Sequence, residues 1–68
     1  MALSDKEIGM RVRNVRRENG LTQDKFARKF HMTQQTLSRY ENGKISIPNG
    51  TLENIAKGMD VPIGFFLG

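Results

Sequence analysis

The chain has 68 residues, enough for one domain whose folding buries only about 60% of the surface of the unfolded chain. It contains no cysteine, which excludes a disulfide framework and a thiolate metal site. The net charge of +4 is concentrated in residues 1–44, where ten Lys and Arg residues stand against five acids, whereas residues 45–68 have one Lys and two acids. This basic segment suggests a polyanionic partner, although solvated helix faces would have the same composition.

The sequence begins with a polar segment and has no apolar run that approaches the roughly 20 residues of a membrane span. We therefore expect a single cytoplasmic domain over residues 1–68 with no membrane partner. An enzyme is not expected, because the only histidine, His31, falls in a predicted turn and the chain has neither a Gly-x-Gly-x-x-Gly nor a Walker-type loop. No cofactor, metal or small-molecule ligand is predicted.

A first helix is predicted over residues 5–19. Ser4 and Glu7 have the spacing of a capping box at its start, and Gly20 suits a left-handed stop at its end. The apolar stripe of this helix, at spacings of four and three, consists of Ile8, Val12 and Val15.

Two short helices follow, over residues 22–30 and 33–41, joined by a turn at His31. Thr22 and Thr33 can cap them, and Asn42-Gly43 ends the second. The residues expected on the inner faces are Phe26, Ala27, Phe30, Leu37 and Tyr40. The residues left facing outward are Gln34, Gln35, Ser38 and Arg39.

A fourth helix is predicted over residues 48–59, opened by Pro48, and a short fifth helix over residues 62–67. Gly58 is expected to weaken the fourth helix by roughly 1 kcal/mol relative to alanine. The buried stripe of this helix is Leu52, Ile55, Ala56 and Met59, and the other methionines are also expected in the core. No alternating strand pattern occurs, so the expected fold is all-α, with five short helices around one core.

The middle of the chain has the spacing Gln23-x3-Ala27-x3-His31-x5-Leu37-x2-Tyr40. On this spacing the sequence resembles the helix-turn-helix of the lambda repressor/Cro-like (XRE-type) family. The flanking runs Ile8-Gly9-x-Arg11-Val12 and Glu41-Asn42-Gly43-Lys44 resemble the same family, so the likeness covers nearly the whole chain. Within the family, Thr33-Gln34-Gln35 looks most like the DNA-binding domains of lambdoid-phage repressors. His31 departs from the usual glycine, at a turn position that needs a positive φ.

The resemblance implies a compact five-helix, lambda-repressor-like fold that puts the start of the third helix into the major groove of double-stranded DNA. Gln34 and Gln35 would read bases, since a glutamine amide can bond adenine N6 and N7 together. Arg39 would read guanine or hold a phosphate. Thr33, through its methyl group, and Ser38 complete the predicted base-reading set.

The resemblance also implies phosphate contacts, from Thr22, Gln23, Arg16, Asn42 and Lys44. Residues that match Arg16 and Glu41 form an ion pair in the family, so Arg16 has a predicted structural role beside its phosphate contact. For Arg13, Arg28 and Lys29 two interpretations stay open, since they are either phosphate ligands or only solvating charges.

The C-terminal segment carries a predicted partner surface. Ile63, Phe66 and Leu67 can satisfy the core, which leaves Phe65 exposed. Related proteins dimerise through this region, and the predicted homodimer interface is therefore Phe65, Ile63 and Leu67. The alternative is that Phe65 only covers a loose chain end.

Together these features predict a sequence-specific DNA-binding transcriptional regulator. The favoured form is a repressor of phage or prophage type that binds a palindromic operator as a homodimer. Within DNA binding, the alternatives are an antitoxin and a restriction–modification controller protein. From a different class, the alternative is a coactivator-type protein-interaction module with the same fold.

Overall fold

The computed structural model describes residues 3–68, and within this range it contains helices and no strand. The helices are α1 (Asp5–Glu18), α2 (Gln23–Lys29), α3 (Gln34–Glu41), α4 (Asn49–Met59) and α5 (Gly64–Leu67). The predicted all-α fold is confirmed. The predicted ranges are longer by one or two residues, chiefly because they included capping residues such as Thr22, Thr33 and Pro48, whose backbones are not helical.

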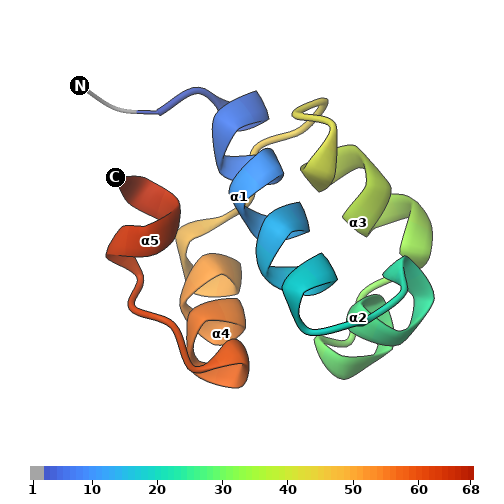
Figure 1. Ribbon diagram of the computed structural model, residues 1–68. Helices are drawn as coiled ribbons and strands as arrows, with labels where there is room; N and C mark the ends of the chain where they lie inside the picture. Colours follow the sequence, from blue (N-terminus) through green and yellow to red (C-terminus); the bar gives the residue numbers. More distant parts are fainter. Residues whose placement is uncertain (1–2) are drawn as a thin grey trace.

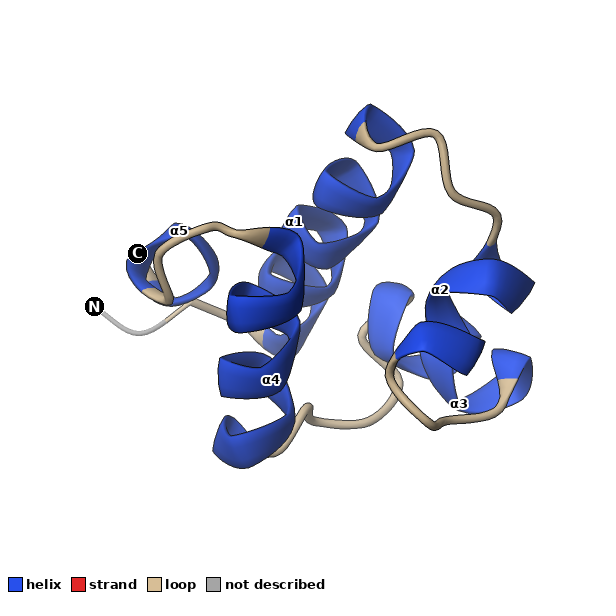
Figure 2. Cartoon of the chain, turned by 90° about the horizontal axis from the view of Figure 1, so that it is seen from below, coloured by secondary structure: helices blue, strands red, loops and turns tan. Residues whose placement is uncertain are grey.

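The α1 helix runs through the middle of the molecule, with α2 and α3 on one side and α4 and α5 on the other (Figure 1). Figure 2 shows the same division from below. The α1 helix packs against α3 and α5, and α2 packs against α3. This arrangement leaves the outer side of the α2–α3 pair open to solvent.

Among residues 3–68, one apolar cluster joins the helices. Its buried members are Val12, Val15, Phe26, Ala27, Leu37, Leu52, Ile55, Ala56 and Phe66. Phe30, Met32 and Met59 are partly buried against it. The expectation that the other methionines are buried is wrong for Met10, which is exposed because it lies off the apolar stripe of α1, and Met1 lies outside the described residues.

Glycines allow two close approaches between helices. A Cβ atom at Gly9 would overlap the backbone carbonyl oxygen of Tyr40, so α1 can cross α3 at this distance only without a side chain there. A Cβ atom at Gly58 would overlap the ring of Phe30. From the sequence, Gly58 is expected only to weaken its helix. In the structure, the absence of a side chain at Gly58 makes room for the ring of Phe30.

The ends of α1, α2 and α3 share one backbone pattern. Each helix is followed by a residue in the left-handed region: Gly20, His31 and Gly43, with φ values of 68°, 58° and 70°. At the end of α2, the His31 N–H donates to the Arg28 carbonyl at 3.2 Å, and the next N–H donates to the Ala27 carbonyl at 2.9 Å. The expected positive φ at His31 is confirmed, and histidine is costlier in this conformation than glycine.

Candidate nucleic-acid interface

Threonine side chains cap α2 and α3 at their starts. Thr22 Oγ1 accepts a hydrogen bond from the Lys25 N–H at 3.2 Å. Thr33 Oγ1 accepts from the Thr36 N–H at 3.1 Å and donates to Thr36 Oγ1 at 2.9 Å. Both hydroxyl oxygens are therefore engaged in capping, and the methyl group of Thr33 is the part of its side chain left for an outside contact.

Three residues of the predicted base-reading set are exposed on α3: Gln34, Gln35 and Arg39. Ser38 is half-buried, and its carbonyl oxygen accepts a hydrogen bond from Asn42 Nδ2 at 2.9 Å. The outer side of the α2–α3 pair that carries these side chains is called the polar face below.

Beneath the polar face lies a buried carboxylate. Glu41 is only 1% exposed, and Arg16 beside it is also buried. Arg16 Nε donates to Glu41 Oε2 at 2.7 Å, and Arg16 Nη2 donates to Glu41 Oε1 at 3.1 Å. Arg16 Nη1 donates to the Leu21 carbonyl at 2.8 Å. The ion pair joins α1 to the end of α3 and also ties down the segment before α2.

Gln23 connects the buried carboxylate to the polar face. Its Nε2 donates to Glu41 Oε1 at 3.1 Å, and its Oε1 accepts from Gln34 Nε2 at 3.4 Å. A carboxylate only accepts hydrogen bonds, so Glu41 determines which end of the Gln23 amide points inward. Gln23 then offers an acceptor to Gln34, and the amide of Gln34 is oriented from the protein interior.

Arg13 is the residue of this site whose role the sequence left open. Its Nε donates to Glu41 Oε1 at 3.3 Å, and its Nη2 donates to Asn42 Oδ1 at 2.9 Å. Arg13 precedes Arg16 by three residues, so the two lie on the same side of α1. That spacing is the signal that could have linked Arg13 to the ion pair.

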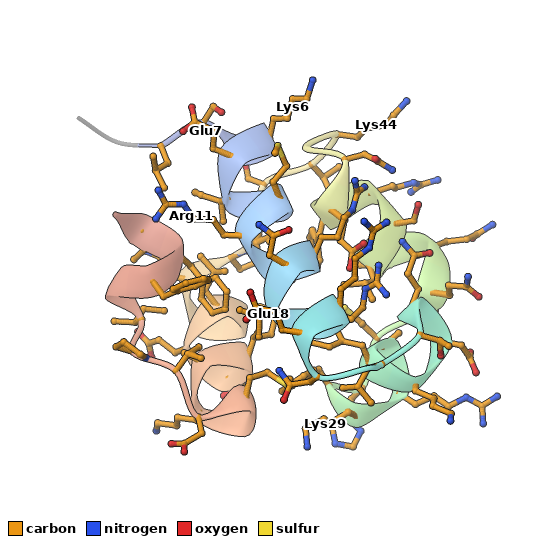
Figure 3. The ribbon with its side chains drawn as sticks, viewed as in Figure 1. Lys6, Glu7, Arg11, Glu18, Lys29 and Lys44 are labelled. Carbon is orange, nitrogen blue, oxygen red and sulfur yellow. The ribbon has the colours of Figure 1, made fainter. Side chains whose placement is uncertain are left out.

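The residues after α3 differ in how firmly they are held. Both ends of the Asn42 amide are occupied, by Arg13 and by the Ser38 carbonyl. Lys44 is exposed in the turn and extends outward at the same end of the molecule as Lys6 (Figure 3). These lysines form a basic edge beside the polar face.

The Glu41 carboxyl makes stability depend on pH. Burial alone would raise the pKa of this carboxyl. Hydrogen bonds from Arg16, Gln23 and Arg13, together with the charge of Arg16, outweigh burial and hold the pKa below the ordinary value of 4.5. A carboxyl with a lowered folded-state pKa contributes stability that is fully present above its ordinary pKa and is lost as the pH falls through its folded-state pKa.

We therefore expect the urea midpoint to fall as the pH drops below 4.5, and the substitution Glu41→Gln to remove this component. Urea unfolding at a series of pH values checks the prediction. Every other carboxyl is present in both proteins, so the difference between the two curves isolates Glu41. Parallel curves would contradict the prediction.

The comparisons with known proteins agree on the family and the fold. The family model described as HTH_3, Helix-turn-helix, matches residues 12–66. The chain belongs to this helix-turn-helix family. The family is the Cro/C1-type, XRE-like group that the sequence resembles, and its members are DNA-binding transcriptional regulators.

Relatives of the helix-turn-helix domain include regulators and an antitoxin. The domain is 37% identical over 62 residues to an uncharacterized transcriptional regulator in the ATPase CF(0) region of Rhodospirillum rubrum, covering 91% of this chain and 57% of that protein. It is 35% identical over 54 residues to antitoxin PezA of Streptococcus pneumoniae, covering 79% of this chain and 34% of that protein. The chain thus spans little more than half of the first relative and about a third of the second.

Solved structures share the fold of the helix-turn-helix domain. The restriction–modification controller protein C.AhdI from Aeromonas hydrophila superposes with a TM-score of 0.84 at 19% identity, covering 91% of this chain and 94% of that chain. The BldD DNA-binding domain of S. venezulae superposes with a TM-score of 0.83 at 23% identity, covering 94% and 96%. At these identities the likeness shows the fold alone.

The helix-turn-helix domain exposes apolar side chains on and just before α5, on the opposite side of α1 from the polar face (Figure 1). Ile63 is 37% exposed, Phe65 40% and Leu67 43%. The expectation that Ile63 and Leu67 satisfy the core is wrong, because one turn of helix can direct only one side toward the core and Phe66 fills it.

Between residues 3 and 68, no helix combines the length and the apolar character needed to cross a membrane.

Proposed function

We propose that this domain is the sequence-specific DNA-binding part of a repressor of phage or prophage type. It acts in the cytoplasm by occupying a palindromic operator as a dimer and blocking polymerase. The observation that carries the proposal is the line of hydrogen bonds from buried Glu41 through Gln23 to Gln34. An exposed glutamine oriented from the interior fits recognition of a defined base edge, since the order of donor and acceptor is set before binding.

The base-reading part of the proposal concerns the outer side of α3. Gln34 keeps its Oε1 acceptor and its second Nε2 hydrogen for adenine. Gln35 and Arg39 are exposed beside it and can bond adenine and guanine edges. The methyl group of Thr33 can contact a thymine methyl. Ser38, which is half-buried, makes a peripheral base contact.

The phosphate-binding part concerns both edges of the polar face. Thr22 and Gln23 stand at the start of α2, where backbone N–H groups and the positive end of the helix favour a phosphate. On the other edge, Asn42 and Lys44 follow α3, and Arg16 supports both edges through its ion pair with Glu41. These contacts position the domain without reading sequence.

The dimer part rests on the exposed side chains of Ile63, Phe65 and Leu67. Large apolar side chains that gather at the surface of a small domain favour a protein–protein contact. They lie on the opposite side of α1 from α3 (Figure 1), so a second copy bound there would leave the polar face uncovered. Two recognition helices about 34 Å apart would then face one side of the DNA.

Binding-site selection from random duplexes tests this function. The expected result is a pair of inverted half-sites whose centres are separated by about 10 base pairs, the spacing of a symmetric dimer. Selection of a single half-site would overturn the dimer, and recovery of no consensus would overturn sequence-specific binding.

Replacing Gln34 by alanine is expected to weaken binding to the selected operator by about 1–3 kcal/mol and to leave binding to random DNA nearly unchanged. A base contact contributes only where its base is present. Fluorescence anisotropy with both duplexes measures the two affinities, and Asn54→Ala, at an exposed position of α4, is the control with no expected effect. An equal loss on both duplexes would exclude Gln34 as a base reader.

A second candidate function is that of an antitoxin. The 35% identity to antitoxin PezA favours it, and an antitoxin with this domain would bind DNA through the same polar face. The two candidates differ in their protein partner. Co-purification of the natural protein with a toxin encoded beside it would favour the antitoxin, and purification without one would favour the repressor.

A further inference from the structure

Arg13 has hydrogen-bonding capacity that the protein does not use. Its side chain is 28% exposed, with Nε on Glu41 and Nη2 on Asn42. A guanidinium carries five N–H donors, and the geometry of these two bonds fixes the plane of the group. In the part of the chain that the structure describes, no buried side-chain nitrogen lacks a partner, so Nη1, which makes no hydrogen bond there, is open to solvent.

The charges around Glu41 do not balance. The carboxylate supplies one negative charge, whereas Arg13 and Arg16 each supply a positive one. The other acid in an ion pair within residues 3–68 is Asp24, which pairs with Arg28 on the surface of α2. Arg16 is buried and uses its donors within the protein, so the excess positive charge is accessible at Arg13.

The position of Arg13 connects the two edges of the polar face. Its Nε shares the Glu41 Oε1 atom with Gln23, which leads to the base-reading end of α3. Its Nη2 holds Asn42 at the other end of α3. An anion that contacts Nη1 would therefore lie beside the helix that carries the base-reading glutamines.

We propose that Arg13 binds a backbone phosphate of the DNA through Nη1 while its other nitrogens stay on Glu41 and Asn42. This inference rests on the proposed function. Asn42 Oδ1 holds Arg13 Nη2 in place, so Arg13 adds a phosphate contact to those proposed for Asn42 and Lys44 at this edge. A guanidinium held in a fixed plane suits phosphate oxygens better than a mobile ammonium does.

The test compares the salt dependence of DNA binding in matched variants of the full chain. For Arg13→Gln we expect the slope of log Kd against log salt to fall by about 0.9 per bound subunit, with equal loss of affinity on operator and random duplexes. Arg13→Lys keeps the charge and is expected to retain the slope. Lys57→Gln removes one exposed charge from α4, on the other side of α1, and is expected to change neither the slope nor the affinity.

Melting curves of the same variants separate binding from folding. Arg13→Gln leaves Glu41 bonded to Arg16 and Gln23, so the variant is expected to stay folded. If Arg13 were only structural, Arg13→Gln and Arg13→Lys would both lower the melting temperature while the slope stayed at its wild-type value, and the inference would be overturned. If the wild-type protein bound no DNA, the proposed function itself would fail.

Discussion

Replacing Glu41 by glutamine is expected to lower the free energy of unfolding by about 3 kcal/mol, because it leaves the buried guanidinium of Arg16 without its counter-charge. A domain of this size has a total stability on the order of 5 kcal/mol, so the variant loses a large share of it. The substitution also replaces a group that only accepts hydrogen bonds by an amide that can accept or donate, so the orientation of Gln23, and with it the support of Gln34, is no longer fixed. Operator affinity is therefore expected to fall even where the variant is folded.

Urea unfolding measures the first effect, and Asp24→Asn is the control of the same chemical type. Asp24 pairs with Arg28 at the surface, where both side chains are more than half exposed, so its substitution is expected to cost less than about 1 kcal/mol. Equal losses for the two variants would show that the buried ion pair contributes no more than a surface one.

Replacing Gly9 by alanine is expected to destabilise the domain by about 3 kcal/mol, the upper end of the range for overpacking. The new methyl group would overlap the Tyr40 carbonyl, and a backbone atom of α3 cannot move aside as the end of a flexible side chain can. The gain of roughly 1 kcal/mol that alanine usually brings to a helix is too small to compensate. DNA binding should weaken as well, because α3 would have to shift away from α1.

The matched control is Gly50→Ala in the first turn of α4, where a Cβ atom would meet no described atom within 4 Å. This variant is expected to be as stable as the wild type or more stable by up to about 1 kcal/mol. Thermal and urea unfolding of the two variants measure the difference. A Gly9→Ala protein as stable as Gly50→Ala would mean that α1 and α3 can separate at little cost.

Much of the fold could be predicted from the sequence because the signals are local. Thr22 and Thr33 cap the helices that follow them, each through a hydrogen bond to an N–H three residues on. Val12 and Leu37 are buried as their helical spacing indicates. The resemblance to the helix-turn-helix family, which has a glycine at this turn position, implied a positive φ at His31, and the structure contains it.

Other features depended on residues that are distant in the sequence. Ile63, Phe65, Phe66 and Leu67 are all apolar, and the sequence could not rank them for burial. The direction from which α5 approaches α1 selects Phe66. The role of Gly58 also depends on a distant residue, because the ring of Phe30, at the end of α2, packs where a Gly58 side chain would lie.

For the candidate site, the sequence by itself determined the residue types and their order: capped helices, two glutamines at the start of α3, and a basic surface. The tertiary structure alone decided how they act on one another. Arg13 and Gln23 meet at the Glu41 carboxylate from positions 28 and 18 residues away. That meeting requires α1 to cross α3 closely at Gly9. A pattern of helical spacing describes which side of a helix is buried, but it contains no information about which helix covers that side or how near it comes.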